Sequence, residues 1–231
     1  MTITETTTVA EIASALPSSV RVFQRHGIDF CCGGRIPLAV ACEEQGLPFA
    51  QIARAIEESV AAPAAAERDW NREPLQALID HIVGTYHDSL REELPRLESM
   101  AVRISRVHGA KAQQLARLEA IVTELSADLR VHMRKEEAVL FPAIRAIESG
   151  RAAAIPLSAP ITTMEHEHDR VGVLLFELRA LTGGYAVPDW ACDTFRALYR
   201  GLRELESAMH VHVHLENNVL FPRALASLAG A

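Results

Sequence analysis

The sequence predicts an all-α protein, an antiparallel four-helix bundle preceded by a small helical domain. Four long segments carry apolar residues at helical spacing, at about 74–107, 111–148, 158–181 and 188–228. The connections between these segments are short and rich in glycine and proline, which end helices. Four long helices joined by short connections favour antiparallel neighbours, so residues 74–231 are predicted to form the bundle.

Residues 1–60 are predicted to form the small domain. Thr8 can cap a helix with Glu11 at the capping-box position, and Gly27 can end the second helix. The stretch Ile28–Gly34, with Cys31 and Cys32 before two glycines, reads as a sharp turn that could expose the thiols. Four helices are expected here, at 9–16, 18–26, 37–45 and 48–60.

Residues 61–73 are predicted to be a linker, because 61–67 offer almost only alanine and proline for packing. Three prolines lie inside the long periodic segments, at Pro95, Pro142 and Pro222. Each is expected to kink or break its helix, since proline removes a hydrogen bond and collides with the preceding turn.

Composition narrows the class of protein. With 231 residues, of which 49% are hydrophobic and 23% charged, the chain can bury a substantial core. A net charge of −7 with scattered basic residues argues against nucleic acid as a partner. The N-terminus resembles no signal peptide and no stretch is apolar enough to span a membrane, so a cytoplasmic protein is expected.

The four cysteines are too few for a disulfide framework. Cys31 and Cys32 are adjacent, so a disulfide between them would be strained, and free or redox-active thiols are expected. The alternative is a pair of small buried residues beside a Gly-Gly turn. Cys42 and Cys192 are expected in the core.

One phrase occurs twice in the chain, which indicates an internal duplication. His132 is followed four residues later by Glu136 and nine residues later by Phe-Pro, and His212 is followed in the same way by Glu216. A His-Asp pair stands upstream of each copy, 45 residues before His132 and 44 before His212. The repeated unit supplies six candidate ligands: His87, His132, Glu136, His168, His212 and Glu216.

These residues fit a dinuclear metal site. A His and a Glu four apart share one helix face and can converge on one ion. All six lie on apolar stripes, and a buried glutamate needs a partner or a metal because desolvating its charge is costly. Imidazole and carboxylate donors suit iron or manganese, with zinc and copper as alternatives. Two octahedral ions have about twelve coordination positions between them. With the six ligands and one bridging oxygen in place, about one coordination position on each ion stays open.

Several neighbouring residues are rivals of this set. His168 is favoured over His166, whose helical neighbours are polar, and Glu136 over Glu137, which points away from the stripe. Glu167 is a candidate for an access or outer-shell role. Other roles are expected for the remaining polar neighbours: Asp88 and Asp169 off the ligand face, His210 and His214 solvated or outer-shell, and His26, His81 and His108 surface or packing.

Specific phrases resemble the iron-sulfur cluster repair di-iron proteins, the repair-of-iron-centres family with a hemerythrin-like domain. They are Thr8–Ile12, Val22-Phe23 and Gly27–Gly34 in the small domain, and Tyr86–Asp88, His132-Met133 with Lys135–Glu137, Glu167–Asp169 and His212–Pro222 in the bundle. The resemblance covers nearly the whole chain. It implies a hemerythrin-like bundle that holds two non-haem iron ions, bridged by oxo or hydroxo, on the six ligands above.

The resemblance also implies a function. The family restores iron-sulfur clusters damaged by nitrosative or oxidative stress, so damaged iron-sulfur proteins are the expected partners, and iron supply is the favoured role. Nitric oxide binding or buffering, and a nitric oxide reductase-like enzyme activity, are the alternatives. The spacing of the ligand residues alone implies none of these functions. Whether the chain forms a homodimer is also left open by the sequence.

Overall fold

The computed structural model describes residues 1–61, 68–151 and 155–229. Over these ranges the chain is helical, and an isolated β-bridge joins Thr8 and Pro37. The predicted all-α fold class is confirmed. The chain divides into two compact units: residues 1–78 with 210–231, and residues 79–209. Residues 62–67 of the predicted linker lie outside the described residues.

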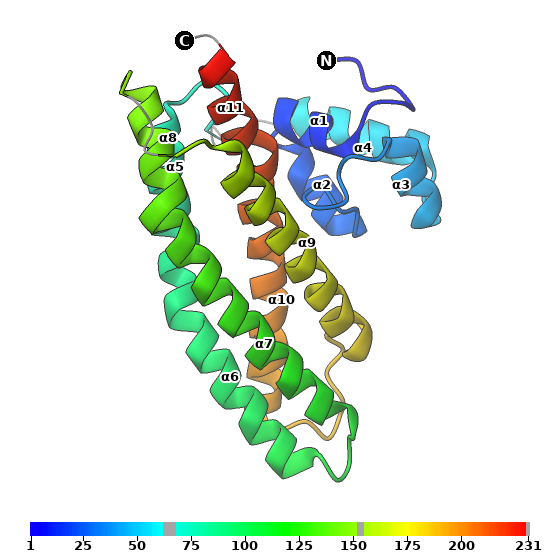
Figure 1. The fold of residues 1–231 in the computed structure, drawn as a ribbon. Coiled ribbons are helices and arrows are strands. Elements are labelled where there is room, and N and C mark those ends of the chain that lie inside the picture. The colour runs from blue at the N-terminus through cyan, green and yellow to red at the C-terminus, as the bar shows by residue number, and fades with distance from the viewer. Residues whose placement is uncertain (62–67, 152–154, 230–231) are drawn as a thin grey trace. The chain divides into compact units, whose positions relative to one another are not determined.

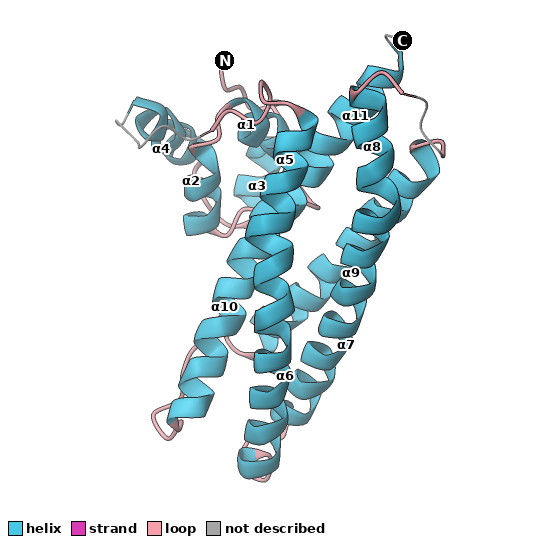
Figure 2. Ribbon diagram, turned by 90° about the vertical axis from the view of Figure 1, so that its left-hand side faces the viewer, coloured by secondary structure: helices cyan, strands magenta, loops and turns pink. Residues whose placement is uncertain are grey.

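The larger unit contains the four-helix bundle. Its long helices are α6, α7, α9 and most of α10, seen lengthwise in Figure 1 and Figure 2. Helix α7 packs against both α6 and α9, and close packing of α6 on α10 is marked by Gly201, where a Cβ atom would lie 2.7 Å from Leu97. The bounds are α6 (Asp88–His108), α7 (Gln114–Lys135), α8 (Phe141–Glu148), α9 (Ser158–Leu181) and α10 (Asp193–His214).

The bundle core is built from the apolar stripes that the sequence shows. On α7, Leu125 and Leu129 are buried in line with His132, and on α9, Met164 and Val171 flank His168 in the same way. The stripe before His87 is looser, because Val83 is only half-buried. In the part of the chain that the structure describes, no helix is long and apolar enough to cross a membrane.

The smaller unit begins with the predicted small helices. Thr8 and Glu11 form the expected capping box, with Glu11 N donating to Thr8 Oγ1 at 3.2 Å and Thr8 N donating to Glu11 Oε2 at 2.9 Å. Gly27 ends its helix at a φ of 68°, a left-handed conformation that glycine adopts without strain. The bounds are α1 (Val9–Ala15), α2 (Ser19–His26), α3 (Leu38–Glu44) and α4 (Phe49–Ala61).

Fully buried side chains hold these four helices together, among them Ile12, Phe23, Phe30, Leu38 and Ile52. Two C-terminal elements belong to the same compact unit, η3 (Leu215–Leu220) and α11 (Phe221–Ala229). Helix α1 packs against η3. Helix α5 (Leu75–Ile82) precedes the bundle.

In the described parts of the chain, three short π-helical segments interrupt the long helices: η1 (Val83–His87), η2 (Glu136–Leu140) and η3. The last two directly precede Phe141-Pro142 and Phe221-Pro222. A proline lacks the N–H that would continue the α-helical ladder, so a wider turn before it relieves the mismatch. The duplicated prolines thus mark matched irregularities, as the sequence suggests.

Pro95 behaves differently, because α6 continues through it. Of the two outcomes expected at Pro95, a kink or a break, the break does not occur, because the helix runs from Asp88 to His108. Pro95 and Arg91 are both exposed, so the Arg91 carbonyl that loses its helical partner can be satisfied by water.

Candidate metal centre

Four of the six predicted ligands come together within the bundle unit. His87, His132, Glu136 and His168 are all buried, with at most 3% of the surface of any of them exposed. Glu136 Oε2 lies 3.4 Å from His87 Nε2 and 3.3 Å from His132 Nε2. His168 Nε2 lies 3.0 Å from His132 Nε2. Three imidazoles from three helical segments therefore converge on one carboxylate.

The same helical spacing explains the arrangement of Glu136. It stands one turn after His132, so the two side chains share the inner face of their helix. The ligand atoms of His132, Glu136 and His168 all lie within 4.8 Å of one another. A carboxylate buried this completely is costly unless positive charge balances it, and nitrogen and oxygen donors in this mixture suit a transition-metal cation.

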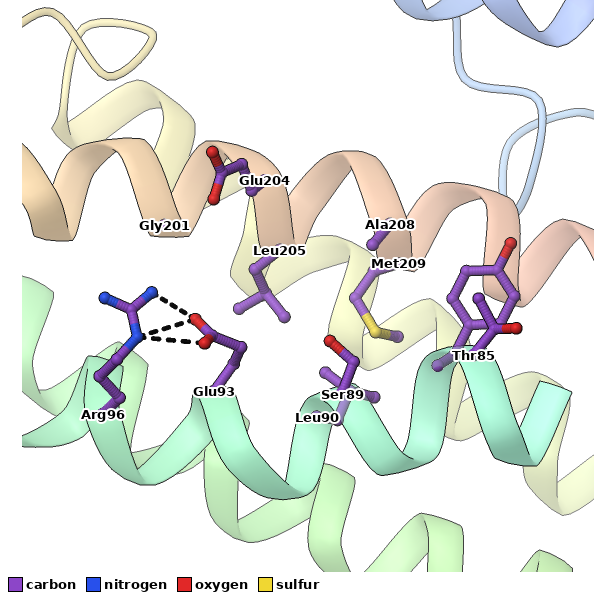
Figure 3. Close-up of a pocket in the computed structure, with 11 residues that line it drawn as sticks. Thr85, Ser89, Leu90, Glu93, Arg96, Gly201, Glu204, Leu205, Ala208 and Met209 are labelled. Carbon is purple, nitrogen blue, oxygen red and sulfur yellow. Dashed lines mark hydrogen bonds and ion pairs between the residues drawn. The ribbon is translucent and has the colours of Figure 1, made fainter.

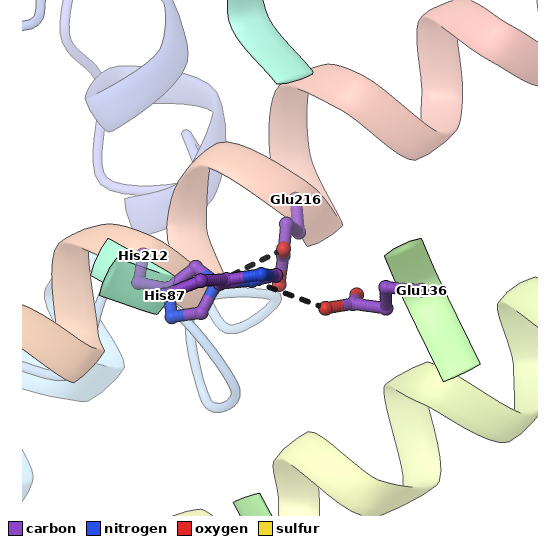
Figure 4. Close-up of side chains that lie close together, drawn as sticks. All are labelled: His87, Glu136, His212 and Glu216. Carbon is purple, nitrogen blue, oxygen red and sulfur yellow. Dashed lines mark hydrogen bonds and ion pairs between the residues drawn. The ribbon is translucent and has the colours of Figure 1, made fainter. Parts of the chain in front are cut away.

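The other two predicted ligands, His212 and Glu216, lie in the smaller unit. Both are buried, and His212 Nε2 lies 3.0 Å from Glu216 Oε1. The spacing repeats that of His132 and Glu136. In Figure 4 a dashed line marks the His212–Glu216 interaction, and another marks the His87–Glu136 interaction.

Two glutamates support the outer nitrogens of the ligand histidines. Glu137 Oε1 lies 2.6 Å from His87 Nδ1, and Glu167 Oε2 lies 3.0 Å from His132 Nδ1. A carboxylate that accepts the Nδ1 proton leaves the Nε2 lone pair directed inward, toward Glu136. The outer-shell role suggested for Glu167 fits this geometry. Glu137 leaves its own stripe, as the sequence suggests, and it reaches a histidine on a neighbouring segment, a contact that the sequence did not predict.

Each of these glutamates is also tied to a cation. Arg91 forms an ion pair with Glu137, and Lys135 forms one with Glu167. Partial burial raises the pKa of Glu167, but the hydrogen bonds from Lys135 and His132 outweigh it and lower that pKa overall. Glu167 is therefore a carboxylate that can accept the His132 proton near neutral pH.

The rival residues are placed as the sequence suggests, with one exception. His166, Asp88 and Asp169 are exposed, whereas His168 is buried. His214 was expected to be solvated or outer-shell, yet only 4% of its surface is exposed. Burial lowers the pKa of His214 to about 4, so its ring is neutral. Its ring meets Phe30 edge-on, with centroids 5.6 Å apart.

The thiol pair has two different environments. Cys31 is buried and Cys32 is half-buried, and both are in the thiol form rather than joined in a disulfide. A hydrogen bond with Cys32 and burial together raise the pKa of the Cys31 thiol well above its usual value. Cys42 is buried as predicted. The expectation for Cys192 was wrong, because that residue is exposed.

A pocket that the sequence does not reveal opens between α6 and α10, with a volume of about 380 Å³ (Figure 3). Small side chains at Ser89, Gly201 and Ala208 leave the space. Its other residues include Leu90 and Met209, which give it an apolar wall. The volume falls in the range of small-molecule sites.

Comparison with known families agrees with this geometry. Residues 78–224 match the hemerythrin HHE cation-binding domain, and residues 5–60 match a domain of unknown function, DUF542 or ScdA_N. The first match covers more than half of the chain and contains all six predicted ligands.

The chain belongs to the iron-sulfur cluster repair family.

Relatives in this family align over almost their full length. The iron-sulfur cluster repair protein YtfE of Pectobacterium atrosepticum is 40% identical over 217 residues, which are 94% of this chain and 96% of that protein. The protein of the same name from Yersinia pseudotuberculosis is 40% identical over 214 residues, 93% of this chain and 94% of its own. The family match and the buried His/Glu group agree on a domain able to hold a metal ion.

Proposed function

We propose that the chain holds two iron ions, bridged by oxo or hydroxo. The ligands in this proposal are His87, His132, Glu136, His168, His212 and Glu216. Three kinds of observation support it. Four of these side chains converge in the bundle unit, the duplicated His-Glu pair recurs in the other unit, and the cation-binding family match spans both. With two bridging glutamates, about one coordination position on each ion is open to exchange.

The chemistry of the donors favours iron. Imidazole and carboxylate ligands bind ferrous and ferric iron without the thiolates that select zinc or copper(I). A bound iron pair supplies exchangeable iron and redox chemistry. The chain's own residues bind it, orient it through Glu137 and Glu167, and exclude water by burying every proposed ligand.

The function that follows is repair of damaged iron-sulfur clusters by supplying iron, with iron-sulfur proteins as recipients. The relatives are named iron-sulfur cluster repair proteins, and the supply of iron is part of the present proposal. The single observation that carries the proposal for this chain is the buried His/Glu group in a chain that also presents the Cys31-Cys32 pair. A cluster that has lost iron is rebuilt from iron, sulfide and the cysteine thiolates of the recipient protein, and exchangeable iron in this chain would supply the first of these.

The first experiment is metal analysis of protein purified without added metal, with optical and Mössbauer spectra. About two irons per chain in a coupled pair are expected. The iron-loaded protein is then mixed with an apo iron-sulfur protein and a sulfide source, and cluster formation is followed by absorbance. The His132→Leu variant should lose iron and transfer together, whereas the exposed His166→Leu control should keep both. Stoichiometric zinc, or iron that never leaves the protein, rules the proposal out.

Nitric oxide binding is the second candidate, and the pocket favours it. Tyr86, Ser89 and Leu90 line the pocket and stand on the helical turn around His87, so a small diatomic molecule could approach the proposed centre there. Stoichiometric, reversible spectral changes with nitric oxide would indicate binding. Repeated turnover with an electron donor would indicate a reductase.

We also propose the domain division 1–60, 61–73 and 74–231. Limited proteolysis tests it, because cleavage should concentrate in 61–73 and leave two protected fragments. Protection of that segment would contradict the division.

A further inference from the structure

The loop that carries Cys31 and Cys32 is attached to the C-terminal part of α10 and to η3, all within the smaller unit. The attachment centres on the backbone carbonyl of Phe30, the residue before Cys31. Asn218 Nδ2 donates to this carbonyl at 3.2 Å, and the His214 side chain donates to it as well. Two side chains from one helical stretch therefore hold a single carbonyl.

The two donors also fix each other. Asn218 Nδ2 lies 3.0 Å from His214 Nδ1. The amide nitrogen that donates to the Phe30 carbonyl is therefore also within hydrogen-bond distance of the His214 ring. The Phe30 side chain is fully buried and adds stacking on Phe23, with ring centroids 6.1 Å apart.

The loop itself has a fixed internal conformation. Asp29 Oδ1 accepts from Cys31 N at 2.8 Å and from the Cys31 thiol at 3.1 Å, and Asp29 Oδ2 accepts from Gly33 N at 2.9 Å. Fixing the carbonyl of Phe30 therefore fixes both thiols, because the loop has little freedom to turn between them. In that position Cys31 is 6% exposed, whereas Cys32 is half-buried.

Side chains on two opposite faces of this stretch of α10 and η3 make different contacts. Residues two apart on a helix point about 200° away from each other. His214 and Asn218 therefore face the thiol loop, while His212 and Glu216 face the opposite direction. The second copy of the duplicated phrase thus contains residues that contact the thiol loop as well as the two proposed ligands.

We propose that His214 and Asn218 form a latch on the Phe30 carbonyl that makes the thiol pair asymmetric, presenting Cys32 as the reacting thiol and holding Cys31 beneath it as the protected one. The two are positioning residues, since they touch neither thiol in this role and act through the backbone. The use of Cys32 in repair rests on the function proposed above. The latch itself does not.

The test is site-resolved alkylation of the full chain by iodoacetamide, read by tandem mass spectrometry, in iron-loaded and in metal-stripped protein. In the unaltered protein Cys32 is expected to react faster than Cys31. The His214→Leu and Asn218→Leu variants each remove one hydrogen bond to the carbonyl, and each is expected to raise the Cys31 rate by about three- to tenfold.

Three controls separate the latch from a general loosening of the fold. Cys42 is buried in the same small domain and should keep its slow rate in both variants. His214→Gln retains a side-chain donor and should return the Cys31 rate toward that of the unaltered protein. His166→Leu, which changes an exposed histidine on α9, should leave every rate unchanged.

Three outcomes overturn the proposal. They are an unchanged Cys31 rate in both leucine variants, a parallel rise at Cys31 and Cys42, and a His214→Gln variant that behaves like His214→Leu. Equal rates for Cys31 and Cys32 in the unaltered protein would refute the asymmetry. Failure of the chain to bind iron or to transfer it would refute the proposed function but would leave these rates, measured on metal-stripped protein, to decide the latch.

Discussion

Replacing Glu137 tests whether the carboxylate behind His87 matters for metal binding. Glu137 Oε1 lies 2.6 Å from His87 Nδ1, and 31% of the side chain is exposed. Its removal leaves the Nδ1 proton without this acceptor and the imidazole less firmly oriented. Loss of such outer partners typically weakens metal binding about 10- to 100-fold, or about 1.4–2.7 kcal/mol. Glu137→Leu should show this full loss.

A graded series sharpens the result. In Glu137→Gln the amide oxygen can still accept the proton but carries no charge, so an intermediate loss is expected. Glu98→Leu is the matched control, because Glu98 is 26% exposed and also pairs with an arginine, Arg130. Iron retained against a chelator of known affinity measures each variant. If Glu137→Leu keeps iron within twofold of the unaltered protein, or if Glu98→Leu loses as much, the reasoning about orientation is wrong.

Three further predictions concern stability. Arg179 forms two hydrogen bonds with Glu206, whose side chain is only 4% exposed, so Arg179→Ala should lower the free energy of chemical unfolding by about 3 kcal/mol. Arg117→Ala, at an exposed pair, should lower it by less than about 1 kcal/mol. Equal losses in the two variants would contradict the role of burial. Burial and the nearby Glu206 raise the pKa of Tyr185. The contribution of Tyr185 to the free energy of unfolding is therefore complete below about pH 10 and is lost above it, by about 1.4 kcal/mol per pH unit. Tyr185→Phe should make the decrease in the free energy of unfolding between pH 10 and 11 less steep. Thr8→Ala removes the capping box of α1 and should lower the free energy of unfolding of the small domain by about 1 kcal/mol; an unchanged denaturant midpoint would show that the cap is dispensable.

Helical periodicity was sufficient to predict that the candidate ligands are buried, because each one sits in an apolar stripe of its own helix. His132 and Glu136 are separated by one turn, and no other element is needed to predict that they share a face. The capping box of Thr8 is equally local, since both of its hydrogen bonds join residues three apart. Features set by one helix were therefore readable from the sequence.

Features set by two elements were not readable in this way. Glu137 leaves its own stripe, and only the packing of a neighbouring segment brings His87 to it. His214 is buried because the loop around Phe30, far away in the sequence, covers it. Periodicity on a single helix shows which face is apolar but does not show which partner covers the other faces.

Cys192 shows a different source of error. The pattern was read as helical from residue 188, which placed Cys192 inside a helix. Helix α10 begins at Asp193, so Cys192 stands in the preceding turn, where its side chain is exposed. The exact end of a helix depends on its capping residues. Hydrophobic spacing alone does not separate the connection at 188–192 from the helix that follows it.

Within the described residues, the π-helical segments place an extra residue in the helices beside the proposed centre. His87 closes η1, Glu136 opens η2 and Glu216 lies in η3. Each segment uses one more residue per turn than an α-helix does. Deleting a single residue from η2 would therefore let the wide turn close into an α-helical one, and the helix after it would face almost the same direction as before. Phe141, whose ring stacks on His87 with centroids 5.8 Å apart, would keep its face, whereas a deletion from the α-helix before η2 would rotate everything after it by about 100°. The η2 segment is thus the part of this helix where a change in residue count has the smallest effect on the residues that follow.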